Sequence, residues 1–126
     1  MSQSKQEIMK QTIEKTSDIT LRISLDKDNI PAKIEWQAQD SPDTPDFKEA
    51  KAMLLSVFDM DYKDTYKIDL WTNELQINEM NKFMYQTLRG LADTFYRSTN
   101  NTELANDMRK FVQYFGEQTE VTAPEN

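Results

Sequence analysis

The sequence has 126 residues, enough for one domain with its own hydrophobic core. It contains neither cysteine nor histidine, which excludes disulfides, thiolate metal sites and the Ser-His-Asp, Cys-His and zinc-hydrolase chemistries. The formal net charge of −7 and the scattered basic residues disfavour nucleic acids and anionic membrane surfaces, because both are bound by clustered Lys and Arg.

The first 16 residues are polar apart from Met1, Ile8, Met9 and Ile13, and we predict a flexible N-terminal extension over residues 1–16. This stretch lacks the apolar block of a signal peptide, and no segment approaches the roughly 18 apolar residues of a membrane span. We therefore expect a cytoplasmic protein without direct membrane insertion.

Residues 17–25 and 32–38 each alternate between apolar and polar side chains, which is the pattern of a half-buried strand. Residues 26–29, with the sequence DKDN, supply a turn between them. The two runs predict an antiparallel hairpin with one face toward water. The turn resembles the start of a calcium loop but lacks the later Gly and Glu that such a loop needs, so we expect a plain turn.

Residues 46–58 have apolar side chains at helical spacing and predict an amphipathic helix that follows a proline-containing loop. Residues 65–71 alternate and predict a third strand. Residues 78–98 and 104–115 carry apolar stripes of helical period and predict two further helices. Glycines stand within the first of these helices and at position 116, where we expect a C-terminal stop.

The predicted element order is β-β-α-β-α-α over residues 17–118, followed by an acidic C-terminal tail over residues 119–126. This order predicts a single α+β domain with a three-stranded, mainly antiparallel sheet and helices packed on one face. Such a sheet is only about 14 Å wide, and two helices about 10 Å apart already cover one face. The apolar stripe of helix 104–115 therefore packs on the other helices or on another chain, and self-association remains an alternative to packing within the monomer.

Acidic residues offer the one candidate for metal chemistry, because Asp59, Asp61 and Asp64 follow one another in a predicted loop. Carboxylates can hold Mg²⁺ or Ca²⁺, and a metal-dependent enzyme is therefore one hypothesis. Most clusters of this kind are solvated loops, and we favour that interpretation. Asp93 lies beside two arginines at helical spacing, Arg89 and Arg97, and predicts a surface ion pair. We predict no catalytic residue, no metal site and no cofactor.

Four side chains lie off the predicted core stripes and belong to residue types that dominate protein interfaces. We predict a candidate interaction surface that contains Trp71, Tyr85, Arg89 and Tyr96. The alternative interpretation is that these side chains form the rim of the core.

Several blocks of the chain resemble the gliding motility protein GldC family. The blocks are LDKDNIPAKIEWQAQD (25–40), EAKAMLLSVFD (49–59), KIDLWT (67–72), MYQTLRGLADTFYRSTN (84–100) and MRKFVQYF (108–115). The resemblance implies a small cytoplasmic accessory protein of bacterial gliding motility, without enzymatic activity or cofactor, that interacts with proteins of the gliding and secretion machinery. No family catalytic residue is transferred to this chain.

A second functional hypothesis is a chaperone-like module that binds unfolded or secreted client proteins. Seven methionines are present, and Met-rich surfaces suit promiscuous binding. Most of these methionines fall on predicted core stripes, which weakens the hypothesis.

Overall fold

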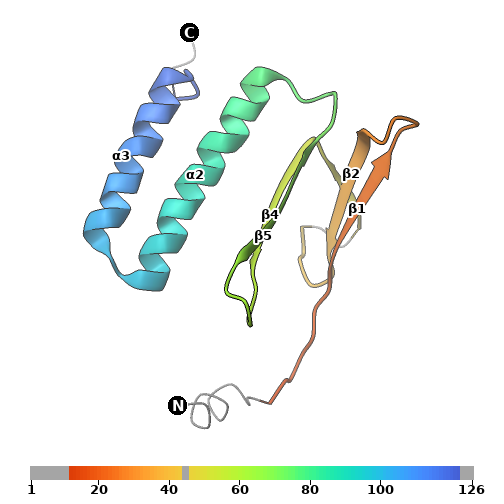
Figure 1. Cartoon of the computed structure of the whole chain (residues 1–126), viewed down its shortest axis with the longest axis horizontal. Helices are drawn as coiled ribbons and strands as arrows, with labels where there is room; N and C mark the ends of the chain where they lie inside the picture. Colours follow the sequence, from red (N-terminus) through yellow and green to blue (C-terminus); the bar gives the residue numbers. More distant parts are fainter. Residues whose placement is uncertain (1–11, 44–45, 123–126) are drawn as a thin grey trace. The chain divides into compact units, whose positions relative to one another are not determined.

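The computed structural model describes residues 12–43 and 46–122. The chain divides into two compact units, Met1–Thr72 and Asn73–Asn126. The elements are β1 (Ile19–Leu25), β2 (Pro31–Ala38), β3 (Lys48–Ala50), β4 (Ala52–Phe58), β5 (Thr65–Trp71), α2 (Ile77–Thr99) and α3 (Thr102–Gln118) (Figure 1). The α+β class is confirmed, but within the described residues five strands precede two helices, so the predicted element order is wrong. Three predictions are not tested by the structure and stay predictions: the N-terminal extension over residues 1–16, the single domain over residues 17–118 and the C-terminal tail over residues 119–126. Most of the extension lies outside the described residues.

The predicted hairpin over the first two strands is confirmed. β1 and β2 pair antiparallel from Ile19 opposite Ala38 onward, with a bulge near the turn. The Asp26 carboxylate accepts hydrogen bonds from the backbone N–H groups of Asp28 at 2.8 Å and Ile30 at 3.0 Å. The segment that resembles a calcium loop is therefore a hairpin turn that uses its first aspartate to bind its own backbone.

The predicted helix over residues 46–58 is wrong, because this segment forms β3 and β4. β3 pairs with β2 and completes a three-stranded sheet of order β1-β2-β3, whereas β4 pairs with β5 in a separate two-stranded sheet. The predicted three-stranded sheet therefore has β3, and not β5, as its third strand. A short segment that is densely apolar fits a period of 3.6 and a period of 2 almost equally well. The antiparallel partner strands decide its conformation by pairing with its backbone.

The two sheets meet at Lys51, the residue between β3 and β4. The backbone carbonyl of Lys51 accepts hydrogen bonds from the Thr72 backbone N–H at 2.9 Å and from the Thr72 hydroxyl at 3.3 Å. Thr72 is only 4% exposed, and Ala52 pairs with Trp71 next to this contact. The double hydrogen bond therefore closes the open end of the β4–β5 hairpin where the chain changes sheets.

The loop between β4 and β5 is built around Asp59. Its carboxylate accepts from the backbone N–H groups of Asp61 at 3.0 Å and Tyr62 at 2.7 Å, and its own N–H donates to the Asp64 carbonyl at 2.8 Å. Within residues 12–43 and 46–122, no group of three acidic side chains is placed to hold a metal ion. The geometry of the acidic cluster is therefore that of a turn.

The two C-terminal helices are confirmed as α2 and α3, which lie side by side as an antiparallel pair (Figure 1). The Glu79 carboxylate accepts from the Gln76 backbone N–H at 3.0 Å, so α2 begins slightly earlier than predicted. Asn100 takes a left-handed conformation at the end of α2, and the Asn101 side chain caps α3 by accepting from the Leu104 N–H at 3.1 Å. These caps explain why the chain reverses within two residues.

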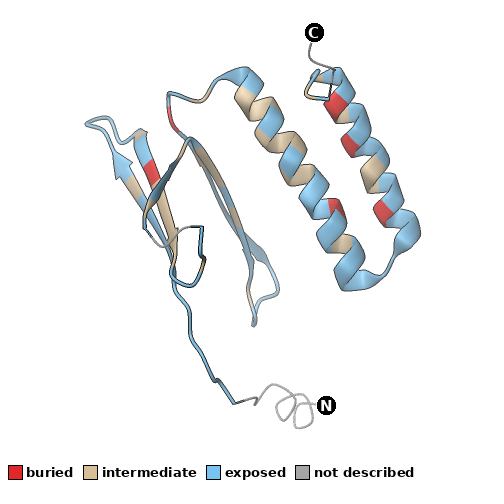
Figure 2. Cartoon of the chain, turned by 180° about the vertical axis from the view of Figure 1, so that it is seen from behind, coloured by how far each residue is buried: buried red, intermediate tan, exposed pale blue. Residues whose placement is uncertain are grey.

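Mostly small residues separate α2 from α3. Only a few residues of the helix pair are buried (Figure 2). They are Ala92 of α2, and Ala105, Val112 and Gly116 of α3. Small residues allow two helix backbones to approach closely, so the larger side chains flank the contact instead of filling it.

Candidate functional site

A groove with a volume of about 500 Å³ lies between α2 and α3 in the second unit. Charged and polar side chains from both helices dominate its lining: Tyr85, Arg89 and Asp93 from α2, and Arg109, Gln113 and Glu117 from α3. Val112 and Thr122 complete it. Two of the four predicted surface residues, Tyr85 and Arg89, therefore lie in one groove.

Gly116 positions one wall of the groove. A Cβ atom on Gly116 would lie 2.7 Å from Cε1 of Tyr85 and 2.8 Å from Cγ2 of Thr122. The expected helix stop at Gly116 is wrong, because α3 continues to Gln118. The glycine instead leaves the space in which the Tyr85 ring lies against the backbone of the neighbouring helix.

Arg89 lies beside Tyr85 on the exposed side of the groove. Its guanidinium carbon is 5.7 Å from the centroid of the Tyr85 ring, within the range of a cation–π contact. Among the residues that the structure describes, no carboxylate lies within ion-pair distance of Arg89. The Arg89 guanidinium, which has five N–H donors, therefore lines the groove without an acidic partner from the described part of the chain.

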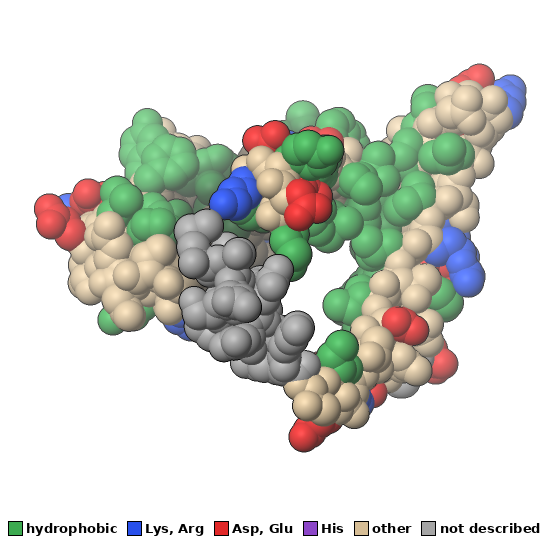
Figure 3. Space-filling model, turned by 60° about the horizontal axis from the view of Figure 1, so that its bottom comes forward, with side chains coloured by type: hydrophobic (Ala, Val, Ile, Leu, Met, Phe, Trp, Pro, Cys, Tyr) green, Lys and Arg blue, Asp and Glu red, His purple; other side chains and the backbone are tan. Residues whose placement is uncertain are grey.

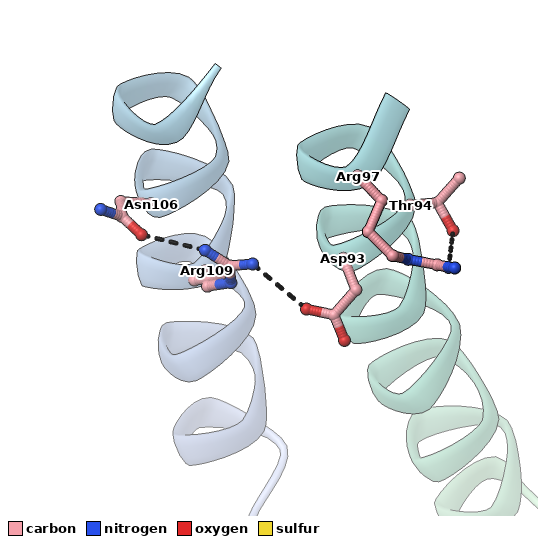
Figure 4. A network of polar contacts seen from close by, with 5 residues as sticks. All are labelled: Asp93, Thr94, Arg97, Asn106 and Arg109. Atoms are coloured by element: carbon pink, nitrogen blue, oxygen red, sulfur yellow. Dashed lines mark hydrogen bonds and ion pairs between the residues drawn. The ribbon is translucent and has the colours of Figure 1, made fainter. Parts of the chain in front are cut away.

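Arg109, in contrast, is held by several neighbours. It donates to the Asp93 carboxylate across the helix pair at 3.3 Å and to the Asn106 side-chain oxygen at 3.0 Å (Figure 4). Its guanidinium carbon also lies 5.4 Å from the centroid of the Tyr96 ring. Arg109 thus links the two helices, and its charge is already matched by Asp93.

The expected pairing of Asp93 with an arginine of its own helix is wrong. Arg97 instead donates to the Thr94 hydroxyl at 3.5 Å, on the same helix (Figure 4). The partner of Asp93 comes from α3, and the spacing within one helix contains no information about it. Arg109 is therefore a groove residue that the sequence pattern did not single out, as are Gln113 and Glu117, although these three recur at the four-residue spacing of one helix face.

The other two predicted surface residues are not among the residues that line the groove. Tyr96 is 37% exposed and contacts Arg109, so it adjoins the groove through that side chain. Trp71 is 55% exposed at the end of β5, in the first unit. Whether these residues form one surface with Tyr85 and Arg89 stays a prediction.

Large hydrophobic side chains are exposed on both units. On the face in Figure 3, hydrophobic side chains form broad patches, whereas Lys and Arg are scattered. The members that are more than half exposed within strands and helices are Ile19, Leu25, Val57, Phe58, Tyr66, Trp71, Ile77, Leu91, Phe111 and Tyr114. Exposed apolar area of this kind marks contacts with proteins more often than with nucleic acids.

Neither α2 nor α3 is long and apolar enough to cross a lipid bilayer, and the described part of the chain contains no other helix that could.

Comparison with known families gives one match. A family model described as "Gliding motility-associated protein GldC-like" matches residues 31–121, which is more than half of the chain. Neither curated proteins nor solved structures give a match. The matched range includes four of the five described strands and both α2 and α3, and it contains every residue that lines the groove except Thr122.

Proposed function

The chain belongs to the GldC-like family of gliding motility-associated proteins, and we propose that it is a non-enzymatic accessory protein that binds a protein of the gliding or secretion machinery in the cytoplasm. The observation that supports this proposal most directly is the groove between α2 and α3, where Arg89 lies beside Tyr85 without a carboxylate partner among the described residues. Tyr and Arg are the residue types on which protein interfaces most depend.

The groove suggests what the partner offers. Its volume of about 500 Å³ suits one or two side chains of a partner segment. Arg89 would donate to a carboxylate or a carbonyl of that segment, and the Tyr85 ring would contact its apolar part. The Asp93 carboxylate is already paired with Arg109. It therefore competes with a partner's carboxylate for Arg89 less strongly than an unpaired carboxylate would.

The test is crosslinking in gliding cells followed by pull-down, with the wild-type chain beside an Arg89→Ala variant. Loss of Arg89 should reduce recovery of an envelope or motility protein by about tenfold, as expected for an interface arginine in a pocket. Arg97→Ala is the matched control, because Arg97 lies on the same helix and bonds to Thr94. Equal recovery with both variants would remove the groove from the proposal, and absence of any motility protein would remove the partner.

Trp71→Ala extends the same experiment to the first unit. A loss of recovery similar to that of Arg89→Ala would make Trp71 part of the binding surface. Unchanged recovery would limit the surface to the helix pair.

A second candidate function is the binding of unfolded or secreted client proteins. The observation in its favour is the exposure of large hydrophobic side chains on both units. A chaperone-like module should bind a hydrophobic dye and suppress aggregation of an unfolded client, and Arg89→Ala should leave this activity unchanged. A chain that neither binds the dye nor protects the client is not a chaperone of this kind.

A further inference from the structure

The outer edge of β5 is available for pairing. β5 is bonded to β4 on one side, and no strand of residues 12–43 or 46–122 pairs with its other edge. Six of its seven residues are exposed, and only Leu70 is half-buried. An edge of this kind presents unpaired backbone N–H and C=O groups that can bond to another strand.

The charges on β5 distinguish it from the other strands with a free edge. Lys67 and Asp69 lie on the same face of the strand, with Nζ and Oδ2 3.4 Å apart. Arg22 is the one charged side chain of β1, and β4 has none. The edge strand β3 has only three residues, and its Lys48 and Glu49 are adjacent, so they point to opposite faces of the sheet. A strand with one Lys and one Asp two residues apart can face an antiparallel copy of itself with opposite charges in register.

We propose that two copies of the chain associate by antiparallel pairing of their β5 strands about Ile68. In this register Lys67 lies opposite Asp69 of the second copy, and the twofold axis repeats the pair. A shift of two residues in either direction would place Lys67 opposite Lys67 or Asp69 opposite Asp69, and like charges directly opposite are destabilising. The charge pattern therefore selects one register.

The opposite face of the strand supports the same register. Ile68 would lie opposite Ile68 of the second copy, and Tyr66 opposite Leu70, so that apolar side chains meet apolar side chains. These residues share their face with Met53 and Leu55 of β4, which continues the apolar surface across both copies. Pairing about a twofold axis uses up the edge of β5 in both copies, so this contact closes as a dimer instead of growing into a fibre.

A cysteine probe tests the register directly, because the chain has no cysteine of its own. In an Ile68→Cys variant the two introduced thiols would face each other with Cα atoms about 4.5–5.5 Å apart, within the range that a disulfide bridges. Tyr66→Cys is the control, because Tyr66 is exposed on the same strand face but its two copies would be roughly 13 Å apart along the strands.

Under mild oxidation we expect Ile68→Cys to form a covalent dimer, visible on a non-reducing gel. The Tyr66→Cys variant should form at least about tenfold less covalent dimer, because its two thiols are too far apart for a disulfide. Equal crosslinking of the two variants, or none with Ile68→Cys, would overturn the proposal.

Charge exchange provides an independent test by analytical ultracentrifugation. Lys67→Asp or Asp69→Lys alone turns both attractive pairs into repulsive ones, and we expect the dimer dissociation constant to rise about tenfold or more. The double variant Lys67→Asp, Asp69→Lys restores opposite charges and should restore the dimer. Lys110→Asp, which breaks an exposed pair with Asp107 on α3, should leave the constant unchanged. The proposal would be overturned if the chain is monomeric at all concentrations, or if neither single variant changes the dimer dissociation constant.

Discussion

The ring of Tyr85 occupies the space that a side chain on Gly116 would need, with Cε1 only 2.7 Å from the position of an added Cβ. A Gly116→Ala variant must therefore push the ring or the backbone of α3 away. We expect the free energy of unfolding to fall by about 1–3 kcal/mol, the usual cost of overpacking. Urea denaturation of the variant would measure this loss.

Gly90 should respond in the opposite sense, although it also lies within a helix. Apart from the surrounding helix backbone, no described atom lies within 4 Å of a Cβ added there, so close packing against α3 does not explain this glycine. Gly90→Ala should stabilise the chain by about 0.5–1 kcal/mol, because alanine favours the helix interior. Compared with Gly116→Ala in one denaturation series, a loss of stability in Gly90→Ala would indicate a contact at this position that the structure does not show.

The pair formed by Asp93 and Arg109 should contribute little by itself. The two side chains are 58% and 40% exposed, and exposed ion pairs are worth about 0.2–1 kcal/mol. A double-mutant cycle with Asp93→Asn and Arg109→Gln should give a coupling energy in this range that decreases as salt is added.

Arg109→Gln alone should cost more than Asp93→Asn alone, because Arg109 also contacts Asn106 and Tyr96. The reverse order would show that these additional contacts do not contribute to stability.

Ile34 is the one large side chain that is fully buried among the described residues, with 1% of its surface exposed. Ile34→Ala should lower the free energy of unfolding by about 2–5 kcal/mol, because it removes buried methyl groups and leaves a cavity. Ile19 lies in β1 of the same sheet and is 74% exposed, so Ile19→Ala should change stability by less than about 0.5 kcal/mol. Similar losses for the two variants would contradict this burial pattern.

Asp59 should matter through its hydrogen bonds in the β4–β5 loop. Asp59→Ala removes two acceptor contacts to backbone N–H groups and should cost about 1–2 kcal/mol. Asp61→Ala serves as the control, because it keeps the Asp59 carboxylate. Calorimetric titration of the wild-type chain with Mg²⁺ and Ca²⁺ should show no binding heat, and a saturable signal lost in both variants would instead support a metal site.

The parts of the fold that could be predicted are those with a long, regular pattern. The β1–β2 hairpin alternates over two full strands around a turn of Asp and Asn, and α2 and α3 repeat their apolar stripes over several turns. Residues 46–58 could not be assigned in the same way, because their apolar side chains satisfy both periods. Pairing with β2 and β5, which is not encoded within the segment, decides that they are strands.

The candidate site likewise contains residues that could be predicted from the sequence and residues that could not. Tyr85 and Arg89 could be chosen from the sequence because they lie one turn apart on a clearly predicted helix and have the chemistry of interface residues. The pairing of Arg109 with Asp93, and the need for a glycine at position 116 beside the Tyr85 ring, both depend on how α3 packs against α2. The spacing of residues along one helix does not predict which residues of another helix will be their neighbours.

The sequence by itself determined the α+β class, the two C-terminal helices, the first hairpin and the absence of imidazole and thiol chemistry, because composition and local periodicity are properties of the chain alone. Only the tertiary structure decided that residues 46–58 are strands, that Asp93 pairs with Arg109, and that α3 forms a groove with the face of α2 that carries Tyr85 and Arg89. These features depend on which segments, distant in sequence, come within hydrogen-bond or van der Waals distance, and a periodic pattern contains no such distances.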